Sequence, residues 1–170
     1  MKFPIASLCC LSALMSGAFS EGALALSPEE LVGTWKLISS VREEVKTGKK
    51  ADNLGAHPNG MLVLTPENRF VLIETAEGRK PSNTVEGLAA LQKSMLAYSG
   101  KYTLSPDPQH PRGLKLINHV DMSWNEEWTG TEQVRFLSIE SDRLVIRTPP
   151  IKNPISGELA ISTLVWERWK

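Results

Sequence analysis

Short apolar runs with alternating polar residues constrain the fold of this chain more than any other feature. Runs such as "LKLINHVDMSW" and "RLVIRT" are rich in β-formers, and turn signals separate the runs every 8–12 residues. About eight such runs with short connections favour an up-and-down antiparallel sandwich or barrel. One segment differs, because apolar residues recur at helical spacing from Val85 to Leu96. We therefore predict one inserted helix over about 84–97, and a short helical turn at "SPEEL" before the first strand.

The N-terminus predicts a secretory signal peptide. Lys2 precedes an apolar run from Phe3 to Phe19, and the small residues of Ala23-Leu24-Ala25 suit a cleavage site. An uncleaved anchor is the alternative, but the run is too short for a membrane span. We expect residues 1–25 to be removed near Ala25. The remainder, 26–170, is then one secreted or periplasmic domain.

Composition excludes several classes of partner and cofactor. The 19 basic and 19 acidic side chains balance, and no basic cluster points to nucleic acid or to a membrane surface. Both cysteines, Cys9 and Cys10, lie in the leader, so the mature chain would have no disulfide and no thiolate metal site. The three histidines show no metal-ligand spacing, and no glycine-rich phosphate loop is present. We expect no metal, no cofactor and no stable membrane insertion.

The two ends of the mature chain carry a family signature. "GTW" (33–35) opens the first strand, and "WERW" (166–169) closes the last. In lipocalins, a late arginine packs over a tryptophan of this kind at the barrel floor, so Trp35 and Arg168 resemble that pair. The middle of the chain is similar to the lipocalin-like domain proteins of bacteria and fungi at 60–70, 97–104, 118–130, 132–137 and 142–148. It departs from them in a proline-rich loop at 105–113 and in "TPENRF", which lacks the glycine often found at that hairpin tip.

The resemblance implies a calycin-type closed barrel with a cavity, and a helix over or beside its mouth. It does not imply one activity, since related folds serve both carriers and enzymes.

His119 is the first candidate site residue, as a hydrogen-bonding group or an acid/base. Strict alternation places it outside the barrel and places Leu116, Val120 and Met122 inside, whereas a bulge near Asn118 would turn it inward. The carboxylates considered for a relay with it are Glu74, Glu126, Glu127 and Glu132, although turn carboxylates are usually only solvated.

Arg135 and Gln133 share one face of their strand, opposite Val134 and Phe136. The apolar pattern places Val134 and Phe136 in the core. The resemblance instead turns Arg135 and Gln133 inward, where a guanidinium suits an anionic ligand group. Both interpretations stay open at this point.

Three aromatic residues have two interpretations each. Trp124 and Trp128 flank a turn, where they either stack on a ligand at the barrel mouth or form a cross-strand pair. Tyr102 either offers its hydroxyl to a ligand or is a core tyrosine with a satisfied hydroxyl. The apolar wall residues expected around a ligand are Met61, Val63, Leu72, Leu91, Leu116 and Met122.

These observations lead to three hypotheses. The first is a carrier that binds a small apolar or amphipathic molecule in the barrel cavity. The second is a cofactor-independent isomerase, cyclase or hydrolase that uses His119 as acid/base, with Tyr102 or Arg135 stabilising negative charge. The third is a filled barrel that acts through its surface.

Overall fold

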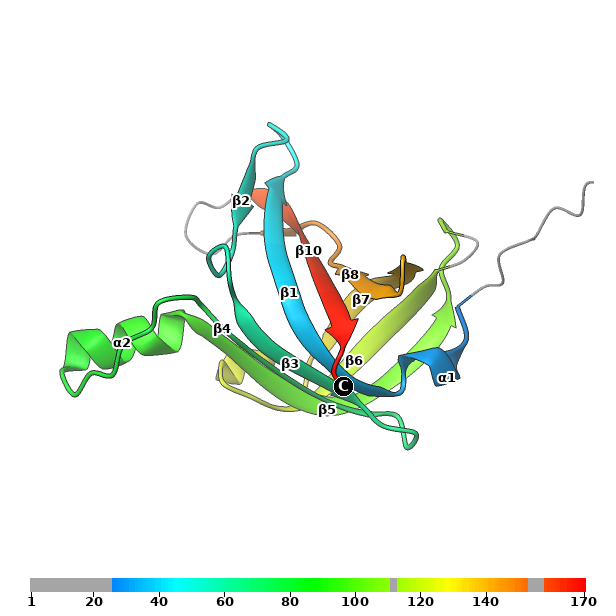
Figure 1. Cartoon of the computed structure of the whole chain (residues 1–170), viewed down its shortest axis with the longest axis horizontal. Helices are drawn as coiled ribbons and strands as arrows, with labels where there is room; N and C mark the ends of the chain where they lie inside the picture. Colours follow the sequence, from blue (N-terminus) through cyan, green and yellow to red (C-terminus); the bar gives the residue numbers. More distant parts are fainter. Residues whose placement is uncertain (1–25, 111–112, 153–157) are drawn as a thin grey trace, which may run out of the picture.

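A ring of antiparallel strands forms the body of the protein, and most strands lie beside their sequence neighbours (Figure 1). The computed structural model describes residues 26–110, 113–152 and 158–170, so the predicted signal peptide lies outside the described residues. The strands are β1 (Gly33–Glu44), β2 (Lys50–Asp52), β3 (Asn59–Leu64), β4 (Arg69–Thr75), β5 (Met95–Pro106), β6 (Leu114–Ser123), β7 (Glu132–Glu140), β8 (Arg143–Arg147), β9 (Ile151–Lys152) and β10 (Leu159–Arg168). Three short helices accompany them: α1 (Pro28–Leu31), α2 (Val85–Lys93) and the 3₁₀ turn η1 (Glu126–Trp128).

The barrel closes where the first and last long strands meet. β1 pairs with β10 from Trp35↔Arg168 to Glu44↔Ala160, and it pairs with β3 on its other side. β2 and β9 are short additions outside the ring, which leaves eight strands in a closed up-and-down barrel. The predicted lipocalin-like barrel is therefore confirmed.

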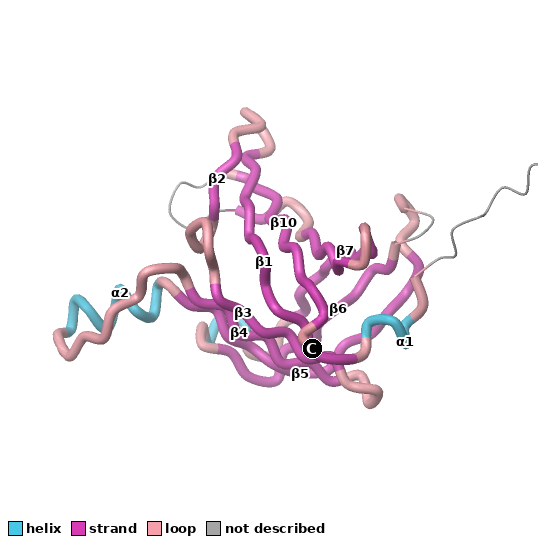
Figure 2. Tube along the Cα trace, viewed as in Figure 1, coloured by secondary structure: helices cyan, strands magenta, loops and turns pink. Residues whose placement is uncertain are grey.

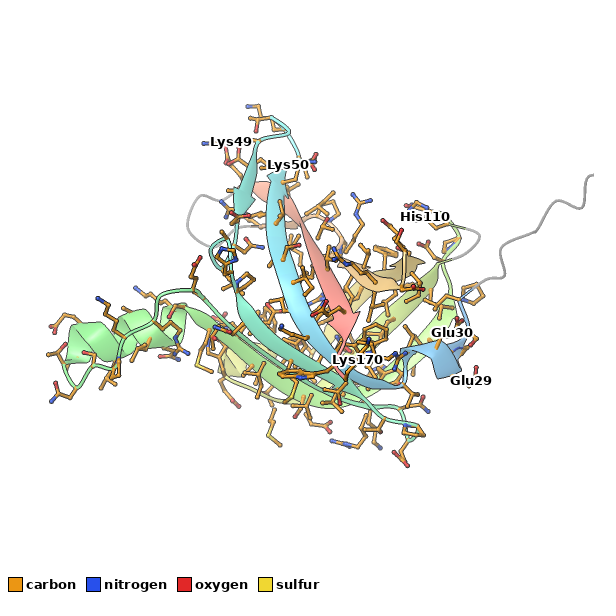
Figure 3. All side chains as sticks on the ribbon, in the orientation of Figure 1. Glu29, Glu30, Lys49, Lys50, His110 and Lys170 are labelled. Atoms are coloured by element: carbon orange, nitrogen blue, oxygen red, sulfur yellow. The ribbon has the colours of Figure 1, made fainter. Side chains whose placement is uncertain are left out.

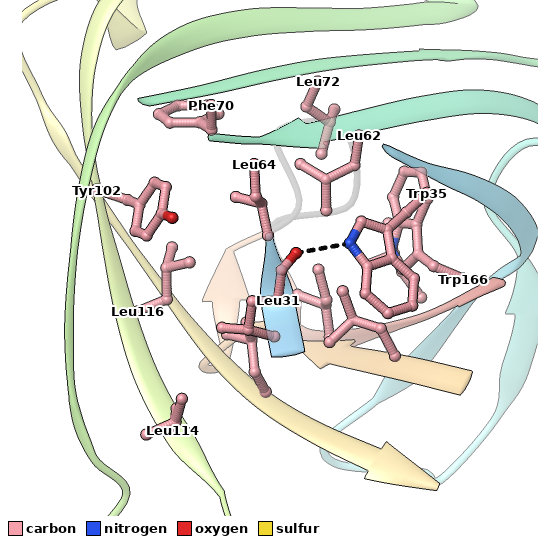
Figure 4. Close-up of a cluster of buried hydrophobic side chains, with 14 of the residues drawn as sticks. Leu31, Trp35, Leu62, Leu64, Phe70, Leu72, Tyr102, Leu114, Leu116 and Trp166 are labelled. Carbon is pink, nitrogen blue, oxygen red and sulfur yellow. Dashed lines mark hydrogen bonds between the residues drawn. The ribbon is translucent and has the colours of Figure 1, made fainter. Parts of the chain in front are cut away.

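Alternation along the strands sorts the side chains into an interior and an outer face. On β4, Phe70, Leu72 and Glu74 are buried, while Val71 and Ile73 are exposed. The same two-residue period on the other strands gathers leucines and aromatic residues into one core (Figure 4).

Two tight turns take backbone conformations that usually call for glycine. In the β3–β4 turn, Asn68 has a φ of 58°, and its N–H donates to the Thr65 carbonyl. Asparagine tolerates this left-handed conformation, which explains how "TPENRF" forms the hairpin without a glycine. In the β7–β8 turn, Ser141 and Asp142 both have positive φ.

The two ends of the barrel differ. α1 lies at the end where β1 begins, whereas the β1–β2 hairpin, α2 and η1 lie at the opposite end (Figure 2). Lys49 and Lys50 mark the tip of that hairpin, away from the core (Figure 3). We call the α1 end the floor and the opposite end the rim.

The inserted helix is shorter than predicted, and it does not cover the rim. α2 ends at Lys93, because Met95 already pairs with Thr75 in the β4–β5 ladder and so cannot stay helical. The helix extends away from the barrel (Figure 1), and none of its residues is buried. Leu91 is therefore not a wall residue of the interior. Of the two positions that the resemblance implied for a helix, over the mouth or beside it, α2 takes the one beside the rim.

Candidate functional site

The floor of the barrel is closed by the pair expected from the two chain ends. The Arg168 guanidinium carbon lies 4.3 Å from the centre of the Trp35 ring, and its Nη1 donates to the Val32 carbonyl over 2.9 Å. The Trp35 indole N–H donates to the Leu31 carbonyl at 2.8 Å (Figure 4). Gly33 has a φ of +139°, and a Cβ there would collide with Arg168. The glycine of the "GTW" motif is thus required for the arginine to reach the indole.

Two ionisable side chains lie inside the barrel among apolar residues. Glu74 ends the inward-facing row of β4 with 5% of its surface exposed, and Arg135 faces inward from β7 with 8% exposed. Arg135 Nη1 donates to the Val134 carbonyl over 2.7 Å, and Nη2 donates to the Tyr98 hydroxyl over 3.3 Å. Arg135 therefore faces inward, as one of the two interpretations had it, and the apolar pattern of β7 was misleading for this residue.

The Glu74 carboxyl is incompletely satisfied. Its Oε1 atom is buried and has no hydrogen-bond partner among the described residues. Burial raises the pKa of Glu74 from 4.5 to about 7, and the positive charge of Arg135 opposes part of that rise. An unpaired buried carboxyl oxygen costs free energy, so its presence in the core points to a role other than stability.

A chain of aromatic rings leads from the interior to the rim. Phe70 contacts Tyr98, Tyr98 contacts Trp128, and Trp128 contacts Trp124, with ring centres 5.2, 5.4 and 5.3 Å apart. All three contacts are edge-to-face, the geometry that aromatic pairs prefer. The Trp124 indole also donates to the Gln92 carbonyl, which ties α2 to the β6–β7 connection. Both tryptophans thus belong to a packed aromatic row at the rim.

The cavity found beside Arg135 in the interior is small. A cavity of about 20 Å³ is lined by apolar side chains together with Asn118 and Arg135. That volume is about the size that one water molecule occupies. A ligand larger than this must therefore displace interior side chains when it binds beside Arg135.

His119 lies on the outer face. Its side chain is 39% exposed, Nδ1 lies 3.2 Å from the Glu132 carboxylate, and Nε2 lies 3.2 Å from the Thr103 hydroxyl. The bulge lies two residues further on, where Gly100 pairs with Val120 and Ser99 pairs with Met122. It therefore comes too late to turn His119 inward. Glu74 faces the interior and His119 does not, so this geometry gives no support to a relay between them.

The same bulge moves Met122 out of the interior. Asp121 is the extra residue, and Met122 beyond it is 65% exposed. It lines an outer groove of about 300 Å³ together with Ile73 and Trp124. Gly100 allows the bulge, since a Cβ there would collide with the His119 carbonyl oxygen. The predicted inward position of Met122 is therefore wrong.

The other predicted residues are divided between the two faces. Leu72 and Leu116 line the small cavity. Met61 lines an outer groove near Trp169, and Val63 shares its half-buried face on β3. Tyr102 is buried, but its hydroxyl donates to the Thr65 carbonyl at 3.0 Å, as expected of a core tyrosine. Gln133 is half-buried and donates to the Thr131 hydroxyl.

Glu74 and Asn118 are buried polar residues that the sequence did not single out as ligand-binding candidates. Asn118 is buried between Leu116 and Val120 on the inward face of β6. The signal for Glu74 was available in "RFVLIET", where strict alternation from Phe70 and Leu72 reaches the glutamate.

The described residues contain neither a cluster of metal ligands nor a membrane-crossing helix. Within residues 26–110, 113–152 and 158–170, no three His, Cys, Asp or Glu side chains gather as a metal ion would require. No helix in the same ranges has the length and apolar character needed to cross a membrane.

Known proteins are similar to this chain in sequence or in structure. The chain is similar to the 4'-hydroxy-3'-methoxypropiophenone carrier protein ppsC of Aspergillus oryzae, with 37% identity over 90 residues, which are 51% of this chain and 78% of that protein. Among solved structures, a mutant of the fluorescent protein UnaG gives a TM-score of 0.36 at 13% identity, over 85% of this chain and 99% of that one. The sequence model of the family described as "Lipocalin-like domain" matches residues 32–169, so the chain belongs to the lipocalin-like domain family.

Proposed function

We propose that this protein binds and carries a small, mainly apolar molecule inside its barrel. The observation that carries the proposal is the burial of two ionisable side chains, Glu74 and Arg135, in a mainly apolar core. Replacing buried charges by apolar residues is often neutral or stabilising, so such a pair contributes little to the stability of an empty barrel. A ligand that uses these groups gives them a function.

The lining favours an aromatic ligand with polar oxygen atoms. Phe70, Tyr98 and Trp128 offer ring edges and faces along one path, and leucines supply the rest of the wall. Burial of apolar ligand surface contributes roughly 25 cal/mol per Å². The relative from Aspergillus oryzae is named as a carrier of an aryl ketone, which has this chemistry.

The rim is the proposed entrance. The Trp35–Arg168 contact and α1 close the floor, whereas the rim carries the longest connections and the aromatic pair Trp124 and Trp128. Opening there requires movement of side chains and loops, and it leaves the floor contacts intact.

We also propose that the carrier works outside the cytoplasm, after cleavage of residues 1–25 near Ala25. Three features of the leader support this location: the positively charged Lys2, the apolar run that follows it, and the small residues of the cleavage site at 23–25. The mass of the intact protein recovered from the producing cells tests it. A mature N-terminus near Leu26 is expected, and a retained leader would contradict the proposal.

Calorimetric titration with 4'-hydroxy-3'-methoxypropiophenone tests the carrier function. Saturable one-to-one binding is expected for the wild-type chain. Leu116→Phe should weaken binding at least tenfold, because Leu116 lines the interior cavity and a larger side chain fills it. The matched control is Ile117→Phe on the other face of β6, which should leave the affinity unchanged. Equal effects of the two variants would place the ligand outside the barrel.

A further inference from the structure

We propose that the interior selects a neutral ligand that donates a hydroxyl hydrogen bond to Glu74 and accepts one from Arg135. This inference rests on the proposed carrier function, and it adds the chemical class of the ligand. It assigns Glu74 as a ligand-binding residue.

Glu74 and Arg135 both lie on the inner face of the barrel. Glu74 follows Phe70 and Leu72 on the inward face of β4, and Leu72 itself lines the cavity that Arg135 also lines. The charge of Arg135 acts on the Glu74 carboxyl. Both side chains therefore lie on the inner face of the barrel within electrostatic reach of each other, although Glu74 itself does not line that cavity.

Glu74 and Arg135 do not form an ion pair or a hydrogen bond with each other among the described contacts. None of the ion pairs found among the described residues joins Glu74 to Arg135. Glu74 Oε1 has no hydrogen-bond partner among the described residues, so it is a buried acceptor without a donor. Each Arg135 Nη atom carries two N–H groups, and the contacts with Val134 and Tyr98 take one from each.

The buried charged side chains of the core disfavour a ligand that carries a negative charge. Among the buried polar side chains that the structure describes, Asp107 is the only charged type besides this pair, and it lies in the loop after β5, outside the core cluster. With Glu74 ionised, the core holds one negative and one positive group. A carboxylate ligand would add a second negative charge to a region of low dielectric constant, which is costly. A neutral hydroxyl compound with a carbonyl oxygen adds no charge and supplies the donor that Glu74 lacks.

Three probes of one shape test the inference: 4-(hydroxymethyl)acetophenone, 4-methylacetophenone without the hydroxyl, and 4-(hydroxymethyl)benzoate with a carboxylate in place of the ketone. Titrations are run at about pH 8, because the pKa of Glu74 is about 7 and the carboxyl is then mostly ionised. The wild-type chain should bind the hydroxymethyl ketone at least about tenfold more tightly than the methyl ketone, and should bind the benzoate weakest.

Glu74→Gln supplies a readout that a merely structural role would not give. The variant keeps the shape of the side chain but removes the negative charge, so the preference for the hydroxyl should fall several-fold. The benzoate should gain about tenfold in affinity, because Arg135 is then uncompensated. Glu132→Gln on the outer face is the matched control and should leave all three affinities unchanged.

The outcomes separate the two proposals. If both ketones bind the wild-type chain equally, or if Glu74→Gln gives the benzoate no advantage, the inference is overturned while the carrier function stands. If no probe and no aryl ketone binds saturably, both proposals fail. The wild-type comparison of the two ketones needs no variant, so the inference remains testable even if Glu74→Gln does not fold.

Discussion

Glu74 is the residue whose ionisation should dominate the pH dependence of stability. Its folded-state pKa of about 7 lies above the ordinary value of 4.5, so the folded protein holds a proton there that the unfolded chain releases. This contribution is fully present below about pH 4.5 and is lost as pH rises through about 7. Glu74→Gln cannot ionise, so we expect it to exceed the wild-type free energy of unfolding by up to about 3 kcal/mol at pH 8, with little difference at pH 4.5.

Urea denaturation at both pH values measures this difference. Glu127→Gln is the control, because Glu127 is exposed on η1 and its loss of charge should shift stability equally little at either pH. Parallel pH profiles for the wild-type chain and Glu74→Gln would show that Glu74 ionises normally in the folded protein.

At this scale the sequence predicted the direction of some side chains but not others. Alternation correctly left His119 outside, and it would have placed Glu74 inside had it been followed along β4. It failed on β7, where half-buried Val134 and Phe136 occupy the outer face and Arg135 takes the core position. Hydrophobicity alone cannot identify a buried charge. The pattern assigns apolar residues to the interior, and a buried arginine is an exception to that preference.

The floor contact is the element-scale feature most open to a stability test. Arg168 both stacks on Trp35 and donates to the Val32 carbonyl, and lysine has neither the planar group nor the fork of donors. Because Arg168 is exposed to solvent, we expect Arg168→Lys to lower the free energy of unfolding by about 1 kcal/mol. Glu167→Gln removes only the exposed ion pair with Lys36, so a loss below about 0.5 kcal/mol is expected from that control.

The projecting helix gives a second element-scale prediction. Leu88 on α2 is 53% exposed, and no residue of the helix is buried. Leu88→Ser should therefore change the free energy of unfolding by no more than about 0.5 kcal/mol, as measured by thermal or urea denaturation. A loss above about 2 kcal/mol would mean that α2 packs on the barrel in solution.

The elements themselves were largely predictable, and the exceptions have local causes. The helical period of 84–97 was real only to Lys93, because ladder pairing of Met95 with Thr75 competes with the last helical turn. The position of the bulge depends on Gly100, whose missing Cβ lets the β6 backbone approach. Neither the end of the helix nor the position of the bulge can be predicted from one strand alone, because both depend on how that strand pairs with its neighbour.

For the whole molecule, the small size of the cavity beside Arg135 links the free energy of unfolding to the affinity for a ligand. The cavity beside Arg135 measures about 20 Å³, so an aromatic ligand must push wall side chains aside. Leu116→Ala removes one of those side chains in advance. We expect it to lower the free energy of unfolding by about 2–5 kcal/mol, yet to tighten the binding of a small aryl ketone, because less of the wall must be displaced.

Ile117→Ala, on the outer face of the same strand, should not affect binding. Urea denaturation and calorimetric titration of both variants measure the two effects. If Leu116→Ala instead weakens binding more than Ile117→Ala does, the barrel does not make room for its ligand by displacing Leu116.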